Sequence, residues 1–172
     1  MKVLPTIYSI EGPWKGQLAI VPRPRGEDWL EDEVQAWRGG GLDVIVSLLT
    51  ASEERELSLA DEAALAQANG LRFLQFPIPD YSVPSSFESA LAFVEKLDEA
   101  LARGENVGIH CRQGIGRSSL IAAAVLVLRG TDPEAAFNQV ATARGRPVPD
   151  TSEQREWVTN FALYLHPATA QR

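Results

Sequence analysis

"NVGIHCRQGIGRSSLIAAAVLVLRG", residues 106–130, joins a short apolar segment to a longer one through a glycine-rich turn. The first segment ends at Cys111 and is bounded by Asn106, which is typical of a short buried strand. From Arg117 onward nearly every position is apolar, which predicts a helix that is buried on all sides. A strand followed directly by a buried helix is the unit from which α/β folds are built. This stretch is therefore predicted to pass through the centre of the molecule.

The rest of the chain repeats the alternation of strands and helices. Further strands are predicted over 42–49, 71–78 and 16–21, the last at an edge of the sheet because prolines follow it directly. Helices are predicted over 27–41, 50–70, 85–104, 117–130, 133–143 and 151–165. Three of these helices open with a capping box, namely Thr50–Glu53, Ser85–Glu88 and Thr151–Gln154. We therefore expect one domain over residues 1–172, an α/β fold with a central parallel-rich sheet of four or five strands flanked by helices on both sides.

Charge and cysteine content narrow the possible functions. The 172 residues include 16 Lys and Arg against 23 Asp and Glu, a net charge of −7, which argues against a nucleic-acid or anionic-membrane surface. A single cysteine excludes an internal disulfide and a multi-cysteine metal cluster. The chain shows neither a signal peptide nor an apolar stretch long enough to cross a bilayer. A reducing, cytoplasmic location is the expected one.

The turn after Cys111 has the features of an anion site. Gly114 and Gly116 allow successive backbone N–H groups to face one side, and the start of the following helix adds partial positive charge. Arg117 supplies a planar set of donors suited to two phosphate oxygens, and these surroundings also favour the thiolate form of Cys111. A phosphate bound here would present its phosphorus to the sulfur. The alternative is that Cys111 is a small buried residue at a strand end and that the glycines only form a turn.

The pattern His110-Cys111-x-x-Gly114-x-Gly116-Arg117-Ser118 resembles the signature of the cysteine-dependent protein tyrosine phosphatase superfamily. The resemblance implies a two-step mechanism without metal or other cofactor, in which Cys111 attacks phosphorus and forms a phosphocysteine. It also implies that Ser118 helps the thiolate to leave and that His110 orders the loop and tunes the thiol. The residues expected to bind the phosphate are Arg112, Gln113, Gly114, Ile115, Gly116 and Arg117.

Expulsion of the leaving group needs a proton donor, and the best candidate is Asp80 in "FPIPDYSVPSS", residues 76–86. It follows the strand predicted over 71–78, so a crossover through the next helix would bring it to the same sheet edge as Cys111. The alternative is a plain turn residue after Pro79. Compact dual-specificity members of the superfamily carry such an aspartate about thirty residues before the cysteine, and the chain resembles this group in length as well.

Three further features are more ambiguous. Gln154 is either a residue that positions the hydrolytic water, as the resemblance suggests, or only a capping residue. Arg144 and Arg146 are expected to add positive potential near the site. The acidic segment 52–58 is most simply a solvated helix start, although in compact relatives the corresponding segment borders the site, which would let Glu53, Glu54 and Arg55 touch substrate.

These observations predict a monomeric phosphomonoester hydrolase of the dual-specificity type that acts on a phosphorylated protein or peptide. One alternative is a phosphoinositide, inositol-phosphate or RNA 5′-end phosphatase on the same scaffold. The variable loop positions Arg112, Gln113 and Ile115 include no lysine, which favours protein or aryl substrates. A second alternative is a phosphate-binding module without catalytic activity.

Overall fold

The computed structural model of the chain describes residues 3–167 and contains a five-stranded sheet with the strand order β1-β2-β5-β3-β4. The strands are β1 (Tyr8–Ile10), β2 (Leu18–Ile20), β3 (Val44–Ser47), β4 (Arg72–Gln75) and β5 (Val107–His110). β1 runs antiparallel to β2, and the other neighbouring pairs are parallel. The predicted α/β fold with a parallel-rich sheet is confirmed.

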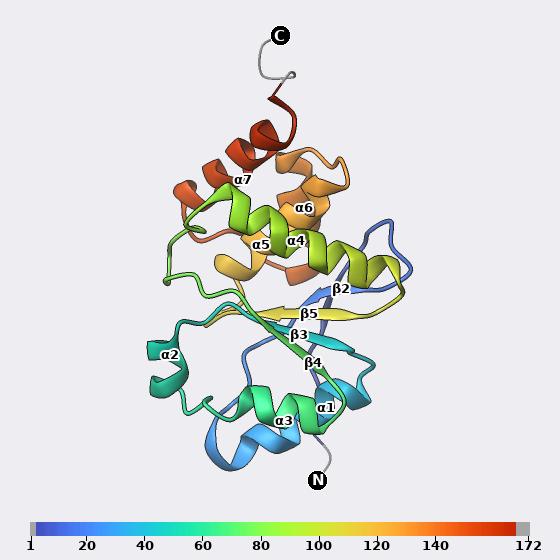
Figure 1. Cartoon of the computed structure of the whole chain (residues 1–172), viewed down its shortest axis with the longest axis vertical. Coiled ribbons are helices and arrows are strands. Elements are labelled where there is room, and N and C mark those ends of the chain that lie inside the picture. Colours follow the sequence, from blue (N-terminus) through green and yellow to red (C-terminus); the bar gives the residue numbers. More distant parts are fainter. Residues whose placement is uncertain (1–2, 168–172) are drawn as a thin grey trace.

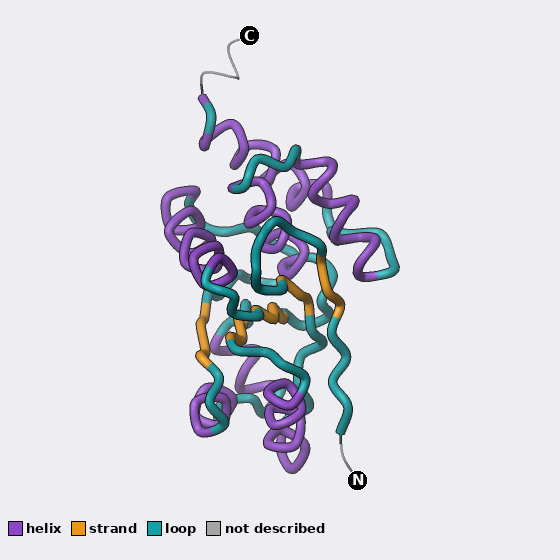
Figure 2. Tube along the Cα trace, turned by 90° about the vertical axis from the view of Figure 1, so that its right-hand side faces the viewer, coloured by secondary structure: helices purple, strands orange, loops and turns teal. Residues whose placement is uncertain are grey.

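Helices cover both faces of this sheet, as the alternating sequence predicts. They are α1 (Leu30–Gly39), α2 (Ala51–Glu56), α3 (Glu62–Ala68), α4 (Phe87–Ala102), α5 (Arg117–Leu128), α6 (Pro133–Arg144) and α7 (Ser152–Leu165), with a 3-10 turn at Glu27–Trp29 before α1. In Figure 1 the four helices α4 to α7 lie above the sheet, and α1 and α3 lie below it. The same three layers are visible in the turned view of Figure 2.

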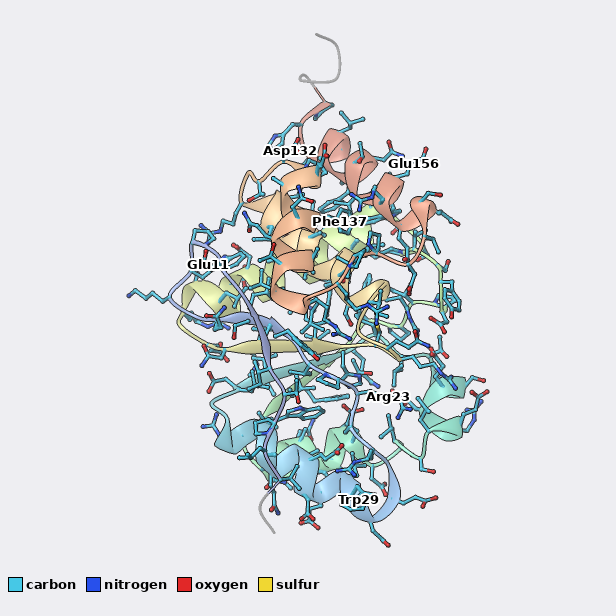
Figure 3. All side chains as sticks on the ribbon, turned by 180° about the vertical axis from the view of Figure 1, so that it is seen from behind. Glu11, Arg23, Trp29, Asp132, Phe137 and Glu156 are labelled. Atoms are coloured by element: carbon cyan, nitrogen blue, oxygen red, sulfur yellow. The ribbon has the colours of Figure 1, made fainter. Side chains whose placement is uncertain are left out.

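The sheet separates two apolar clusters of buried side chains. The larger one lies under α4 to α7 and includes Phe137, which Figure 3 shows among these upper helices. The smaller one packs Val34 and Trp37 of α1 against Ile45 of β3. Because both faces are covered, β3 and β5 are buried at every position. The helix α5 is buried over eleven successive residues from Arg117, which confirms its predicted central place.

The position predicted for the strand over 16–21 is wrong. β2 lies inside the sheet, between β5 and the additional strand β1, which was not predicted. The prolines at 22 and 24 follow the end of β2, and Val21 still donates its N–H to the carbonyl of Ile109 at 3.0 Å. A proline interrupts pairing only at its own position, so it leaves the preceding strand free to pair on both sides.

The single helix predicted over 50–70 is also wrong, because the chain forms two short helices, α2 and α3. Ser58 between them has φ 57, a left-handed conformation that ends the first helix. The break turns Leu59 into the core, where it is 1% exposed. The start of α4 differs as well: Ser86 caps it by accepting from Ser89 N–H, whereas the capping boxes at Thr50 and Thr151 are confirmed.

Within the part of the chain that the structure describes, no helix combines the length and the apolarity needed to cross a membrane.

Candidate active site

The site lies at the carboxyl end of β5, where the loop of residues 111–116 leads into α5. Parallel strands end at one edge of a sheet, so the segments that follow β3 and β4 reach the same place. These segments carry α2 and the loop of Asp80. The sheet topology therefore brings together residues that are far apart in the sequence.

The loop curls around Cys111, a buried residue that is 3% exposed. Gly114 has φ 70, and its N–H donates to Cys111 Sγ at 3.2 Å. On the outside of the loop, Arg144 of α6 donates to the carbonyls of Gly114 at 2.9 Å and Gln113 at 3.2 Å. Since the N–H and C=O of a trans peptide point in opposite directions, this turns the N–H groups of Gly114 and Ile115 inward, toward the sulfur.

Arg144 contacts the loop from its outer side, close to the site where the sequence suggests added positive potential. Its guanidinium lies 4.3 Å from the centre of the Tyr8 ring and binds loop carbonyls, so it holds the loop from behind. The side chains of two residues that were expected to bind phosphate make other contacts. Ile115 buries its side chain in the core, and Arg112 pairs with Glu56 of α2 at 3.3 Å.

Arg117 is 1% exposed, and its guanidinium is held along one edge. Nη1 donates to Glu53 Oε1 at 2.7 Å and to the carbonyl of Ile78 at 2.8 Å, while Nη2 donates to Glu53 Oε2 at 2.9 Å. The second contact of Nη2 is Asp80 Oδ1 at 3.0 Å. Among residues 3–167, Arg117 Nε has no partner. The other edge of the group therefore offers Nε–H to an anion oxygen, and it offers Nη2–H to a second oxygen that takes the place of Asp80.

Arg117 and Glu53 form a buried ion pair. Burial alone would lower the pKa of Arg117, but its hydrogen bond to Glu53 and the charges of Cys111, Glu53 and Asp80 raise it above its ordinary value. Burial likewise opposes ionisation of Glu53, but the hydrogen bonds from Arg117 and from Thr50 N–H outweigh it and lower the pKa of this carboxyl. Arg117 therefore keeps its positive charge although it is buried.

The assignment of residues 52–58 to a solvated helix start is wrong for Glu53, which is 7% exposed. As the N3 residue of the capping box it turns back toward Thr50, and this orientation also aims its carboxylate at Arg117. Glu54 next to it binds Gln75 of β4. The capping box was visible in the sequence, but the contact across 64 positions was not.

Asp80 lies in the loop after β4, beside Arg117. Its carboxylate accepts from Tyr81 N–H at 3.0 Å and is 3.0 Å from Arg117 Nη2. The side chain is 37% exposed, so a ligand can displace it from Arg117. Tyr81 has φ 61 and is 55% exposed, which places an aromatic side chain in a strained backbone conformation next to the carboxylate.

The start of α7 closes the site on another side. Gln154 is fully buried, completes the capping box with Thr151 and donates to the carbonyl of Ser82 in the Asp80 loop at 3.1 Å. A Cβ on Gly116 would lie 2.5 Å from Asp150 Oδ2 and 2.8 Å from Gln154 Oε1, so both side chains touch the loop.

Asp150 was not singled out in the sequence. Burial, followed by the charge of Asp80, raises its pKa, while the charges of Arg146 and Arg117 partly offset this. The site therefore holds two neighbouring carboxylates.

Two buried polar groups flank the loop. Ser118 Oγ is buried and has no hydrogen-bond partner among the described residues. His110 is also fully buried, and its Nε2 lies 2.5 Å from Glu62 Oε1 of α3. Glu62, like Glu53, reads in the sequence as an ordinary surface position of a helix.

Comparison with known proteins supports the resemblance carried by the loop. Residues 21–131 match the family described as "Polymorphic toxin system, DSP-PTPase phosphatase". "Putative tyrosine phosphatase 197R" of Invertebrate iridescent virus 6 is 30% identical over 162 residues, which are 92% of this chain and 56% of the viral protein. "Cyclin-dependent kinase inhibitor 3" of Rattus norvegicus is 25% identical over 142 residues, 79% of this chain and 66% of the rat protein. The chain thus spans between about half and two thirds of the length of these relatives.

Solved structures show the same fold over almost the whole chain. A crystal structure of kinase associated phosphatase, with serine in place of its catalytic cysteine, has a TM-score of 0.87 at 21% identity and covers 96% of this chain and 98% of its own. The active form of Tk-PTP has a TM-score of 0.75 at 27% identity and covers 93% and 98%. By the match over residues 21–131 and by this fold, the chain belongs to the DSP-PTPase phosphatases, a compact dual-specificity family within the cysteine-dependent protein tyrosine phosphatases.

Proposed function

We propose that the protein hydrolyses phosphomonoesters through a phosphocysteine on Cys111. The observation that carries this proposal is the buried Nε–H of Arg117, which has no partner among residues 3–167. The guanidinium is 1% exposed and is fixed by Glu53 beside the loop of the thiol. A buried donor without a partner costs free energy, which a bound phosphate oxygen would recover.

In the first step the Cys111 thiolate forms a bond to phosphorus while the bond to the ester oxygen breaks. Arg117 and the inward N–H groups of the loop stabilise the equatorial oxygens as they gain charge. The leaving oxygen takes a proton from Asp80. In the second step water attacks phosphorus, Asp80 takes a proton from it, and the thiolate leaves with the help of the Ser118 hydroxyl.

The contact between Asp80 and Arg117 links binding to proton transfer. Asp80 Oδ1 occupies the Nη2–H that a phosphate oxygen would use, at 3.0 Å. A bound phosphate displaces the carboxylate from the cation and places an anion beside it. This exchange releases Asp80 from Arg117, so that its carboxyl group can face the leaving oxygen.

Asp80→Asn is expected to lower kcat about 10²-fold or more for a phosphotyrosine peptide, and less than tenfold for p-nitrophenyl phosphate. The reason is that nitrophenolate leaves without full protonation, whereas a tyrosine phenolate does not. Steady-state rates on both substrates test this. Asp150→Asn, which removes the neighbouring carboxylate, should affect both substrates alike; equal losses in Asp80→Asn would remove this residue from the acid role.

Arg144→Met is expected to raise the inhibition constant of orthovanadate up to about thirtyfold, because two hydrogen bonds of roughly 1 kcal/mol each no longer hold the loop carbonyls. Arg129→Met is the matched control, since Arg129 pairs with Asp98 on the surface at the other end of α5. An unchanged inhibition constant for Arg144→Met would show that the loop keeps its shape without this contact.

As substrate we propose a phosphorylated protein or peptide. We also propose that the protein acts as a monomer, because the nucleophile Cys111, the phosphate-binding Arg117 and the acid Asp80 all come from one chain. The absence of lysine at positions 112, 113 and 115 supports this choice over phosphoinositides. A cytoplasmic location suits a thiol that must stay reduced. Matched rates on phosphotyrosine and phosphothreonine peptides, a phosphoinositide and p-nitrophenyl phosphate test the substrate class; a preference of more than tenfold for the lipid would overturn it.

A further inference from the structure

A buried contact joins His110, the residue before the nucleophile, to Glu62, and it takes no part in the two-step mechanism described above. His110 precedes Cys111 and is fully buried, and Glu62 at the start of α3 is 1% exposed. His110 Nε2 is 2.5 Å from Glu62 Oε1, while Glu62 Oε2 has no partner among residues 3–167. Removing a carboxylate from water in this way is costly unless it pairs with a cation.

The two ring nitrogens of the imidazole both face oxygen atoms. Nε2 faces the Glu62 carboxylate, and Nδ1 faces the carbonyl of Cys111 at 3.4 Å. A neutral imidazole can donate to only one of these oxygens, whereas an imidazolium donates to both.

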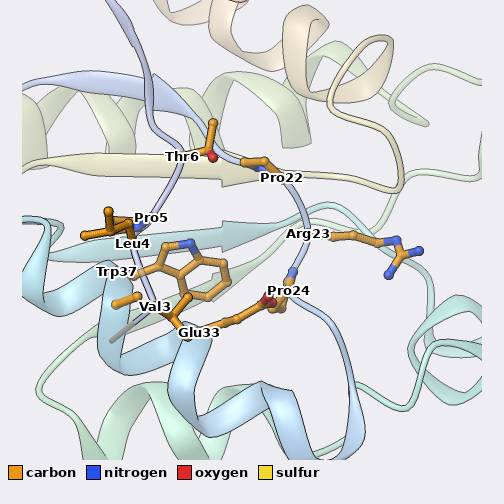
Figure 4. A pocket seen from close by; sticks show the side chains of 10 residues that line it. Val3, Leu4, Pro5, Thr6, Pro22, Arg23, Pro24, Glu33 and Trp37 are labelled. Atoms are coloured by element: carbon orange, nitrogen blue, oxygen red, sulfur yellow. The ribbon is translucent and has the colours of Figure 1, made fainter. Parts of the chain in front are cut away.

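The aromatic ring of Trp37 stacks on His110 with the ring centres 5.9 Å apart. Trp37 also lines a small cavity of about 110 Å³ between the N-terminal segment and α1, where Figure 4 shows its indole beside Pro5 and Glu33. The indole is only 3% exposed, so the imidazole lies in surroundings of low polarity. Charges interact strongly in such a place, and the imidazole contacts the backbone carbonyl of Cys111.

We propose that Glu62 is a positioning residue that keeps His110 doubly protonated and thereby stabilises the thiolate of Cys111. The positive end of the pair lies next to the sulfur-bearing residue, and the negative end lies in α3. This inference rests on Cys111 being the nucleophile of the proposed function.

The charged groups near His110 and Glu62 determine which variant can serve as a control. Burial and then the charge of Glu62 raise the pKa of Glu54 on α2, and the charge of His110 partly offsets this. Charged groups around the thiol also include Arg117 with its partners Glu53 and Asp80. Further ones are Asp150 beside Gly116, and Arg112 and Arg144 at the loop. Glu54 is therefore the matched carboxylate, close enough to sense the pair but hydrogen-bonded to Gln75 instead of His110.

The direction of the effect separates two explanations. If Glu62 acted only as a nearby negative charge, Glu62→Gln would stabilise the thiolate and move its titration to lower pH. If Glu62 holds the second proton on His110, the same change removes a cation beside the sulfur and moves the titration to higher pH.

The experiment measures the pH dependence of Cys111 alkylation by iodoacetamide. Alkylation needs no phosphatase turnover, so a negative result for this inference can be distinguished from a negative result for the proposed function. We expect the midpoint of Glu62→Gln to rise by about one pH unit, His110→Asn to rise similarly, and the double variant to show no further rise. Glu54→Gln should leave the midpoint in place or lower it. An unchanged or lower midpoint in folded Glu62→Gln would overturn the proposal.

A second measurement uses the parent protein and avoids variants that fail to fold. The sequence has two histidines, so nitrogen NMR with His166→Asn as the assignment control isolates the His110 ring. Two protonated ring nitrogens at neutral pH support the proposal. A single protonated nitrogen contradicts it.

Discussion

Cys111→Ser is expected to lower the rate of p-nitrophenyl phosphate hydrolysis by at least about 10³-fold and to leave the fold intact. A serine hydroxyl at this place stays protonated, so the loop loses its charged nucleophile. It keeps the N–H groups and Arg117, so binding of a phosphotyrosine peptide is retained. The residue is 3% exposed and close in size to serine, so melting temperature should change little.

Ser119→Ala provides the matched control for this change. Ser119 is another small, fully buried polar residue at the start of α5, without a hydrogen-bond partner in the described part of the chain. It carries no role in the proposed mechanism, so its replacement should keep turnover. Hydrolysis by Cys111→Ser at the parent rate would show that the phosphocysteine mechanism is wrong.

Arg117→Met is expected to have two effects that a second substitution separates. The catalytic effect is a loss of about 10³-fold or more in kcat/KM, because the donors for the equatorial oxygens are gone. The structural effect is a loss of roughly 3 kcal/mol of stability, because Glu53 remains buried without its cation. The loss of stability comes from the unpaired carboxylate of Glu53 and does not depend on phosphate binding.

The double variant Arg117→Met, Glu53→Gln should therefore recover most of the stability and none of the activity. Urea unfolding and steady-state rates on the same samples measure both quantities. If stability returned together with activity, Arg117 would be only a structural residue. If neither single nor double variant lost stability, the ion pair would contribute nothing to the fold.

The central part of the fold was predictable because its pattern is local. Residues 106–130 combine an apolar strand, a turn that requires glycine and a helix without a polar face, and each of these is visible without knowledge of the partner elements. The place of Asp80 beside Arg117 followed from topology, since parallel strands end at one edge.

The contacts that orient the site were not predictable from spacing. Glu53 and Glu62 each sit at the start of a short helix, where an acidic residue is favoured by the helix dipole in any protein. Their partners Arg117 and His110 are 64 and 48 positions away. Only the tertiary structure, which brings α2 to the start of α5 and α3 to the end of β5, turns two ordinary helix starts into parts of the site.

The errors in the fold have a similar origin. β1 has three residues and is stabilised by pairing with β2 rather than by its own sequence. The break at Ser58 depends on burial of Leu59, a tertiary contact that overrides the helical propensity of the segment.

The single cysteine has a consequence for exposure to peroxide. Oxidation of the Cys111 thiolate gives a sulfenic acid, and these 172 residues hold no second thiol that could condense with it. The sulfenic acid can instead condense with a backbone nitrogen to give a sulfenamide, or with an external thiol to give a mixed disulfide. Water is lost in both reactions. Both products return to the thiol only by reaction with thiols from outside the chain. Recovery from an oxidative burst is therefore set by the surrounding thiol pool and not by the protein itself.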